Sequence, residues 1–431
     1  MARLRIQGGF VLPMEPTDAV IPEGVVVIEG EKIAYVGPGP GPERSGDEEV
    51  LDATGCAVLP GLVNAHTHVS MTLLRGYADD MALQEWLEQR IWPAEMKLTW
   101  DDVYWGAMLG IAEMLRSGTT TFNDMYHKPD AVAQAVRDGG IRGCISGVML
   151  GILPTAEEML REAIELIQQM RQEAHPRLVP MLAPHAPYTC PDPLLVRMAE
   201  AAADLGVAVH IHVAETAREV EDSVKQHGAT PVQHLEAIGL FEVPVVAPHC
   251  VHLTPEDIEV LARRRVGVVH CPTSNMKLAS GFAPVKELLE AGAVVGLGTD
   301  GAASNNNLDM IEEMMLGAVI AKGHTGDPTA VSATQMLAMA TRGSAEALGL
   351  GEQVGTLEVG KVADVIVVDL GAAHNQPVHN VVSQLVYAAR GGDVRDVVVQ
   401  GEVVLRNREL LTMDEQEVKA RAREAAARLV G

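Results

Sequence analysis

The sequence predicts an α/β protein: a (β/α)8 TIM-like barrel with a small β-sandwich domain built from both chain ends. Eight short β-rich runs in the middle of the chain are each followed by a helical pattern, which is typical of a parallel barrel. Both chain ends instead show short strands separated by glycine turns. A doubly wound open sheet is the alternative, but it should carry a glycine-rich phosphate loop after its first strand, and the sequence has none there.

The two chain ends predict the sandwich. Residues 1–57 form its first part, and the β-branched runs around Gly30 indicate a hairpin. Residues 356–431 form its second part and a terminal amphipathic helix. The barrel then occupies residues 58–355, inserted between the two parts, because chain termini often lie close together. Short strands are expected in 355–370 and 396–407.

The middle of the chain supplies the barrel strands. The eight runs are 56–68, 119–124, 142–150, 178–187, 207–215, 243–251, 266–274 and 293–301. The intervening segments carry helix signals. Thr254 and Pro255 are suited to the N-cap and first position of a helix over 254–264. Gly206 is suited to end the helix that precedes it.

The charge and composition limit the partners. With 58 Asp and Glu against 33 Lys and Arg, the formal net charge is −25 at pH 7. Binding to nucleic acid or to anionic membranes depends on Lys and Arg, so this charge argues against both partners. No apolar stretch approaches the ~18–20 residues of a spanning helix, and we see no secretory signal pattern. We therefore expect a cytoplasmic protein. Five widely spaced cysteines argue against a disulfide framework.

Histidine and carboxylate side chains gather at the predicted carboxyl ends of the strands, where barrels of this type place their chemistry. His66 and His68 end the first run, His212 the fifth and Asp300 the eighth. Residues i and i+2 of a strand point to the same side, so His66 and His68 can reach one cation. Three imidazoles and a carboxylate suit Zn²⁺ or Fe²⁺ and leave room for a water. Such a metal lowers the pKa of that water to ~7.

Two further residues are expected to handle protons. Glu215 lies three residues after His212, near the metal but free to act as a proton shuttle. His249 ends the sixth run, where it can hold the attacking water or polarise a substrate. Asp300 can also accept a proton. His210 lies one pleat deeper than His212, and we expect it to be a hydrogen-bonded core residue.

Five motifs together resemble the amidohydrolase superfamily over essentially the whole chain. They are PGLVNAHTH, HVAET, HCVHLT, CPTSNMKLASG and GTDGAASNN, followed by GTLEVGKVADVIVVD at the return into the sandwich. The last four of the five are similar to one branch of that superfamily. This branch contains the 5-methylthioadenosine/S-adenosylhomocysteine deaminases, chlorohydrolases and guanine deaminase.

The resemblance implies roles for individual residues. It implies a metal-dependent hydrolase barrel that binds one divalent metal per subunit, with Zn²⁺ preferred over Fe²⁺ as the assignment. The implied ligands are His66, His68, His212 and Asp300. Glu215 matches the proton shuttle, which also contacts substrate, and His249 the residue that orients water without ligating. Trp86 and Glu95 match residues that bracket a ribose, while His185 and Ser304 match purine contacts.

The segment after the third strand departs from this pattern. S-adenosylhomocysteine deaminases carry an Arg there for the amino-acid carboxylate, but residues 143–160 contain no Arg or Lys, and Arg142 starts the strand at the opposite end. Burying a carboxylate without a cationic partner is costly. We therefore expect a neutral 5′ group, accepted by apolar side chains after the strand. These are Val148, Met149, Leu150 and Ile152.

The sequence therefore predicts a metal-dependent hydrolytic deaminase of adenosine-like nucleosides. Substrates would be 5′-methylthioadenosine, 5′-deoxyadenosine or adenosine, with S-adenosylhomocysteine less favoured, and products the inosine analogue and ammonia. Two alternatives stay open. One is an aminohydrolase or chlorohydrolase acting on another purine or a triazine. The other is a catalytically idle barrel that binds a nucleoside. The expected partner is a small nucleoside, without nucleic acid or membrane, and a homo-oligomer is left open.

Overall fold

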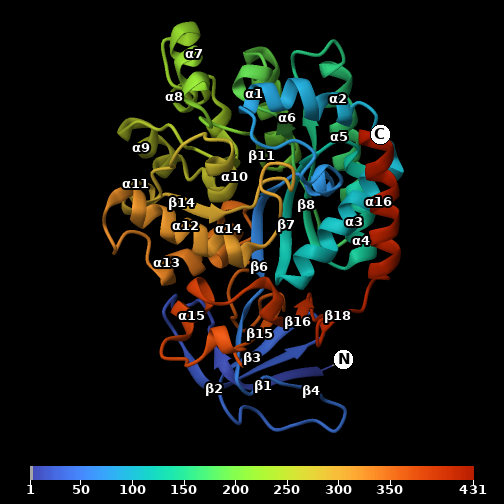
Figure 1. Ribbon diagram of the computed structural model, residues 1–431, viewed down its shortest axis with the longest axis vertical. Helices are drawn as coiled ribbons and strands as arrows, with labels where there is room; N and C mark the ends of the chain where they lie inside the picture. Colours follow the sequence, from blue (N-terminus) through green and yellow to red (C-terminus); the bar gives the residue numbers. More distant parts are fainter. Residues whose placement is uncertain (1–2) are drawn as a thin grey trace.

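The computed structural model describes residues 3–431 and contains the predicted barrel (Figure 1). Its strands are β6 (Leu62–Thr67), β7 (Thr119–Tyr126), β8 (Arg142–Met149), β9 (Leu178–Pro180), β10 (Ala183–Pro184), β11 (Val209–His210), β12 (Val245–Pro248), β13 (Gly267–His270) and β14 (Val294–Leu297). They form two parallel sheets, β10-β8-β7-β6 with β9 on β8, and β11-β12-β13-β14. A parallel bridge between Leu182 and Val209 joins the sheets at one seam. At the other seam the Asp300 amide donates to the His66 carbonyl at 3.0 Å.

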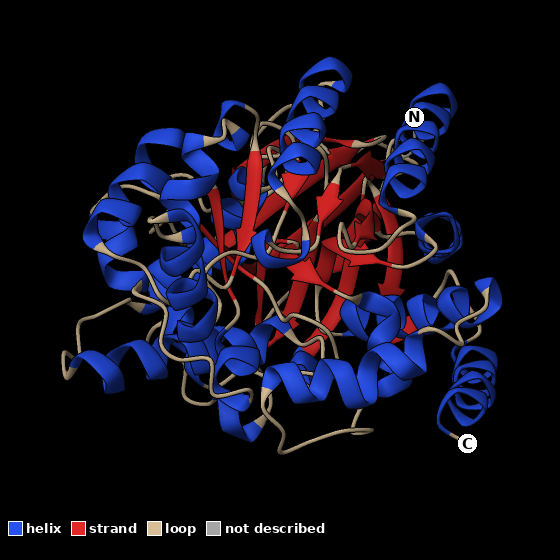
Figure 2. Ribbon diagram, turned by 90° about the horizontal axis from the view of Figure 1, so that it is seen from above, coloured by secondary structure: helices blue, strands red, loops and turns tan. Residues whose placement is uncertain are grey.

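Helices surround these strands, as the view from above shows (Figure 2). They are α3 (Trp100–Arg116), α4 (Pro129–Gly139), α5 (Ala156–Glu173), α6 (Asp192–Leu205), α7 (Ala217–His227), α8 (Pro231–Ala237), α9 (Pro255–Arg264), α10 (Pro272–Lys277), α11 (Val285–Glu290), α12 (Met310–Thr325), α13 (Ala333–Ala338) and α14 (Ser344–Ala347). Every residue of β6 and β7 is buried, as expected for parallel strands covered on both faces. The barrel fold prediction is therefore confirmed.

The helix boundaries follow the cap residues. Thr254 caps α9 with a reciprocal capping box to Asp257, which satisfies amides that would otherwise lack partners. Gly206 ends α6 in the left-handed conformation, with φ of 56°, where glycine has no steric cost. Within residues 3–431 no helix is both long and apolar enough to cross a membrane.

Some predicted runs are longer than the strands they contain. The first run is divided between β5 (Cys56–Pro60) and β6. Gly61 separates the two strands, and a Cβ there would approach Thr120 to 2.0 Å, so the close contact requires glycine. In the fifth run only Val209 and His210 are strand, because the chain then turns towards the loop that carries Glu215.

The two chain ends combine into one nine-stranded sheet at the other end of the molecule (Figure 1). Its order is β18 (Glu409–Leu410), β17 (Glu402–Arg406), β16 (Val394–Val399), β15 (Val365–Asp369), β5, β1 (Arg3–Val11), β2 (Ile21–Glu29) and β3 (Lys32–Pro38), with β4 (Glu49–Asp52) beside β1. Alternate residues serve two cores. In β15, Val365 and Val367 join the core of the sheet itself, whereas Ile366 and Val368 join the large core of the barrel, as the period of a strand requires.

The last helix, α16 (Glu415–Val430), returns to the barrel and packs on α3 (Figure 1). It buries the stripe Val418, Ala422, Ala425 and Leu429, which has the spacing of one helix face. Its Arg428 pairs with Asp102 of α3. The chain end therefore lies along the side of the barrel.

Candidate active site

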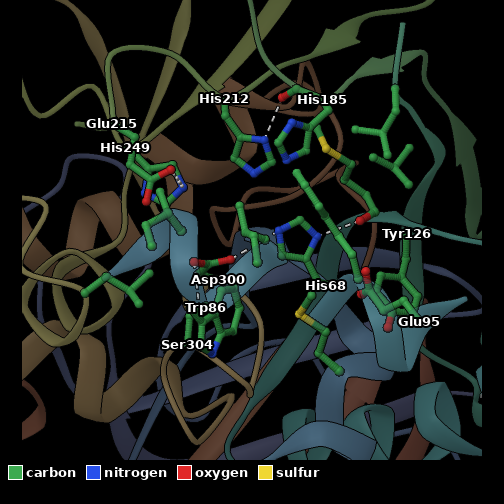
Figure 3. A pocket seen from close by; sticks show the side chains of 18 of the residues that line it. His68, Trp86, Glu95, Tyr126, His185, His212, Glu215, His249, Asp300 and Ser304 are labelled. Atoms are coloured by element: carbon green, nitrogen blue, oxygen red, sulfur yellow. Dashed lines mark hydrogen bonds and ion pairs between the residues drawn. The ribbon is translucent and has the colours of Figure 1, made fainter. Parts of the chain in front are cut away.

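A cavity opens at the carboxyl ends of the barrel strands (Figure 3). Its lining includes nine of the residues expected from the sequence: His68, Trp86, Glu95, His185, His212, Glu215, His249, Asp300 and Ser304. His66 is fully buried beside this cavity, and its ring centroid lies 4.9 Å from that of His68. The structure thus gathers these residues from five different strand ends and the segment 83–95.

Three histidines present the same nitrogen to a common centre. The Nδ1 atoms of His68 and His212 lie 2.6 and 2.7 Å from the carbonyl oxygens of Met125 and His185. The Nδ1 of His66 lies 2.9 Å from the Nε2 of His210. An acceptor at Nδ1 places the proton there and leaves the Nε2 lone pair free. His68 and His212 are therefore prepared as Nε2 ligands, and so is His66 in the tautomer of His210 whose Nε2 accepts the proton.

The carboxylate of Asp300 completes this centre. Its Oδ1 lies 3.4 Å from the Nε2 of His66 and 3.3 Å from that of His68. Its Oδ2 accepts hydrogen bonds from the hydroxyls of Ser274 and Ser304, at 2.6 and 2.8 Å. Asp300 is 6% exposed and has a φ of 62°, which is uncommon outside glycine and is typical of functional sites.

The donor set fits a divalent metal ion. The buried Nε2 of His66 has no hydrogen-bond partner within the described structure, and such an atom is costly unless something binds it. His66 belongs to two trios whose ligand atoms lie within 4.8 Å of one another, one with His68 and Asp300 and one with His212 and His249. Three imidazoles and a carboxylate are ligands that Zn²⁺ and similar ions prefer.

The protonation states of His66 and His212 agree with this use, whereas His68 forms a charged pair with Asp300. Burial lowers the pKa of His66 to about 3 and holds that of His212 well below its usual range, so both are neutral bases at pH 7. Burial also lowers the pKa of His68, but the hydrogen bond and charge of Asp300 outweigh burial and raise it to about 9. Burial raises the pKa of Asp300, but the adjacent imidazoles of His66 and His68 outweigh burial and hold that pKa well below normal.

Glu215 and His249 face this centre from neighbouring loops (Figure 3). The Oε2 of Glu215 lies 3.9 Å from the Nε2 of His249, and the Nδ1 of His249 lies 2.8 Å from the side-chain oxygen of Asn275. Burial raises the pKa of Glu215, which suits a carboxyl group that both accepts and delivers a proton.

The outer part of the cavity is aromatic and acidic. The indole of Trp86 donates to the carbonyl of Ala78 at 3.0 Å and is 4% exposed, so its ring is held in place. Glu95 is 9% exposed and lies 3.5 Å from the Nε2 of His127. Burial, together with the charge of Glu95, raises the pKa of Tyr126 well above its ordinary value. Burial lowers the pKa of His185 to about 3, so this ring is neutral.

The expectation for the segment after β8 is partly wrong. Val148 and Leu150 line the cavity. Met149 does not, because successive strand residues point to opposite sides, and it is 1% exposed in the core. Ile152 is 63% exposed, because a turn closed by the Leu153 amide and the Leu150 carbonyl carries it outward. Throughout the described chain, no Lys or Arg belongs to the cavity lining.

Four positions contribute in ways that the sequence did not reveal. His210 supports His66 instead of acting only in the core, and Ser274 and Asn275 support Asp300 and His249. Glu219 is 7% exposed and accepts the backbone amides of Ala214 and Glu215, both at 2.8 Å. The position of Glu219 in the first turn of α7 (Ala217–His227) is a signal that the sequence offers, because the first turn of a helix favours acidic residues.

Comparisons with known proteins identify related enzymes. The model of the amidohydrolase family matches residues 57–404. A 5-methylthioadenosine/S-adenosylhomocysteine deaminase from Pelotomaculum thermopropionicum is 50% identical over 431 residues, which cover 100% of this chain and 99% of the relative.

Two solved structures are also similar. A zinc-bound adenosine deaminase from Xanthomonas campestris superposes with a TM-score of 0.95 at 42% identity, covering 99% of this chain and 98% of that one. An atrazine chlorohydrolase from Arthrobacter aurescens, complexed with zinc, gives 0.89 at 26% identity, covering 98% and 100%. Since the family model covers most of the chain and relatives match its full length, this protein belongs to the amidohydrolase family.

Proposed function

We propose that this protein hydrolytically deaminates adenosine-like nucleosides to the inosine analogue and ammonia. The observation that carries the proposal is the buried set of three imidazoles and Asp300, faced by Glu215 and His249 inside one cavity. The names of the relative that is 50% identical and of the structure that is 42% identical support this substrate class.

The proposed ligands of one divalent ion are His66, His68, His212 and Asp300, and Zn²⁺ is our first choice because it is bound in both similar structures. When bound, such an ion lowers the pKa of water to about 7 and supplies a Lewis acid. The supporting bonds to the three Nδ1 atoms would orient the ligands. We keep His249 outside the ligand set, as the family resemblance implies, and assign it to the water, since its Nε2 lies near the cluster and 3.9 Å from the Oε2 of Glu215.

The chain's own residues would move the protons. Glu215 takes a proton from the attacking water and delivers it to the leaving amino nitrogen, so that a C6–O bond forms, the C6–N bond breaks and ammonia leaves. His249, with its Nδ1 held by Asn275, stabilises the oxygen that adds to C6. Asp300 accepts the second proton of the water, and this proton ends on N1 of the purine, so that both carboxylates return to their starting state.

The cavity residues would orient the nucleoside. Trp86 and Glu95 lie where they can bracket a ribose, Trp86 through its ring face and Glu95 by accepting hydroxyl protons. His185 faces the purine as a neutral ring. Ser304 lines the cavity, but its hydroxyl lies 2.8 Å from Asp300, so it would contact the base only by sharing that hydroxyl.

A substrate panel tests the function. We expect ammonia release from adenosine, 5′-deoxyadenosine and 5′-methylthioadenosine, measured together with the absorbance change of the purine. Guanine and a chlorotriazine belong in the same panel, because the zinc-bound chlorohydrolase shares the fold. Turnover of either of these without turnover of the adenosines would contradict the proposal. Tight nucleoside binding with no turnover by the metal-loaded protein would favour an idle barrel.

The 5′ substituent gives a sharper prediction. The lining offers Val148 and Leu150, which can bury a methylthio group at ~25 cal/mol per Å², but no cation in the described chain to pair with a carboxylate. We therefore expect a higher kcat/KM for 5′-methylthioadenosine or 5′-deoxyadenosine than for S-adenosylhomocysteine, because an unpaired polar group is penalised more than a methylene. Equal or faster turnover of S-adenosylhomocysteine would show that a cation reaches this pocket from elsewhere.

Glu219 should act as a positioning residue. Its two oxygens hold the amides of Ala214 and Glu215, whereas Gln offers a single acceptor. We expect Glu219→Gln to lower kcat by up to about 100-fold, the scale of a 1 Å misplacement, with KM and metal content retained. Glu221→Gln on the same helix is the control, since this residue is exposed. An unchanged kcat in Glu219→Gln, or an equal loss of kcat in both variants, would rule out a positioning role for Glu219.

The cytoplasmic location stays a prediction.

A further inference from the structure

We propose that Asp192, His227 and His234 form a second site for a divalent transition-metal ion, outside the active site. One ligand atom from each residue lies within 4.8 Å of those of the other two. The three residues come from the start of α6, the end of α7 and the middle of α8. The helices α7 and α8 contact each other and lie at the end of the molecule away from the nine-stranded sheet (Figure 1).

The geometry is close to that of a shared ligand set. The Nε2 of His234 lies 2.8 Å from Asp192 Oδ1. The rings of His227 and His234 stack with centroids 3.7 Å apart and planes 29° apart. Around a tetrahedral ion with bonds of ~2.1 Å, ligand atoms are about 3.4 Å apart. Because His227 is exposed and the side chain of Asp192 is 43% exposed, small rotations can bring the atoms to that spacing.

The surroundings favour a cation. The three residues line a hollow that also contains Glu219, Asp222 and Tyr188. Its charged lining is acidic, and none of the Lys or Arg residues of segment 3–431 belongs to it. Two imidazoles and a carboxylate are ligands for Zn²⁺ and for similar borderline ions, whereas Mg²⁺ and Ca²⁺ prefer oxygen ligands. The ligand class is therefore Zn²⁺, Co²⁺, Ni²⁺ or Cu²⁺.

This second site is exposed to solvent, whereas the active-site cluster is buried. His66 is 0% exposed, while His227 lies at the surface. An ion held by three partly exposed ligands should exchange more readily than one in the buried cluster. It would tie together the start of α6, the end of α7 and the middle of α8. Tyr188 lines both this hollow and the active-site cavity. We therefore expect bound metal to raise the thermal unfolding midpoint, since a ligand that binds only the folded state stabilises it.

Zinc titration of the purified protein, already loaded with its tightly held ion, tests the site. We expect calorimetry and equilibrium dialysis to show one additional, exchangeable equivalent of Zn²⁺ per chain, and the unfolding midpoint to rise with Zn²⁺ concentration. Co²⁺ in place of Zn²⁺ should give the visible absorption of an ion with nitrogen and oxygen ligands. Gel filtration at each step reports whether metal uptake changes the oligomeric state.

Three variants and one control decide the assignment. We expect a loss of affinity for the additional Zn²⁺ in each of the variants His227→Ala, His234→Ala and Asp192→Asn. The loss should exceed the roughly 10–100-fold typical of losing an outer-shell partner, and the tightly held ion should stay bound. His379→Ala, another exposed histidine, should bind like the parent. His227→Ala replaces a surface side chain and should fold normally. The proposal is overturned if no additional equivalent binds, if it survives in His227→Ala, or if uptake requires two chains to associate.

Discussion

Replacing Glu215 by Gln should abolish most of the turnover while leaving the protein folded and loaded with metal. We expect kcat to fall by ~10²–10⁴-fold, the typical contribution of a general acid–base group. The amide keeps the shape of the side chain and its contact with the Ser280 hydroxyl at 3.4 Å, but it cannot take a proton from water at neutral pH. KM for the best adenosine-type substrate should change little. Steady-state kinetics with metal analysis of the same sample make the measurement.

The comparison with Glu221→Gln separates chemistry from general charge effects. Glu221 lies on α7 and forms a surface ion pair with Lys225 at 3.7 Å, and such pairs contribute little to stability. That variant should have the kcat of the parent. If Glu215→Gln kept near-parental kcat, Glu215 would have no part in proton transfer, and His249 would become the next residue to test, since it lies 3.9 Å away.

Removal of His66 should cost the protein its tightly held metal and, with it, the activity. Its Nε2 is buried, and its ligand atom belongs to both trios of the cluster. We expect His66→Ala to retain less metal than any single outer-shell variant, with kcat/KM reduced by more than the roughly 10–100-fold that loss of an outer-shell partner causes. The measurement is metal content after exhaustive desalting, followed by kcat/KM with and without added Zn²⁺.

A graded series makes this result specific. His210→Ala removes the partner of the His66 Nδ1 at 2.9 Å, so it should weaken metal affinity by about 10–100-fold and respond to added Zn²⁺. His379→Ala removes an exposed ring far from the cluster in sequence and should match the parent. Full metal retention in His66→Ala would contradict the ligand assignment. Equal losses in His66→Ala and His210→Ala would place both effects on folding instead.

The sequence alone determined the order of the elements and the sides on which many side chains lie. Alternation of β-rich and helical segments predicted the barrel, because strand and helix periods depend only on local backbone geometry. The same local rule placed His66, in β6, and His68, directly after this strand, on one side. It also predicted the start of α9 at Thr254 and the end of α6 at Gly206, where caps act over a few residues. The resemblance to a family added roles that periodicity cannot supply.

Only the tertiary structure decided which distant groups meet. His66 and His210 are 144 residues apart along the chain, yet their nitrogens lie 2.9 Å apart. No local pattern encodes that distance. The same holds for Asn275 beside His249 and for His227 stacked on His234. Ile152 was expected in the cavity because it is apolar and follows β8, but a turn directs it outward. Burial and pKa depend on every element packed around a group, so they follow from the closed barrel and not from the residues themselves.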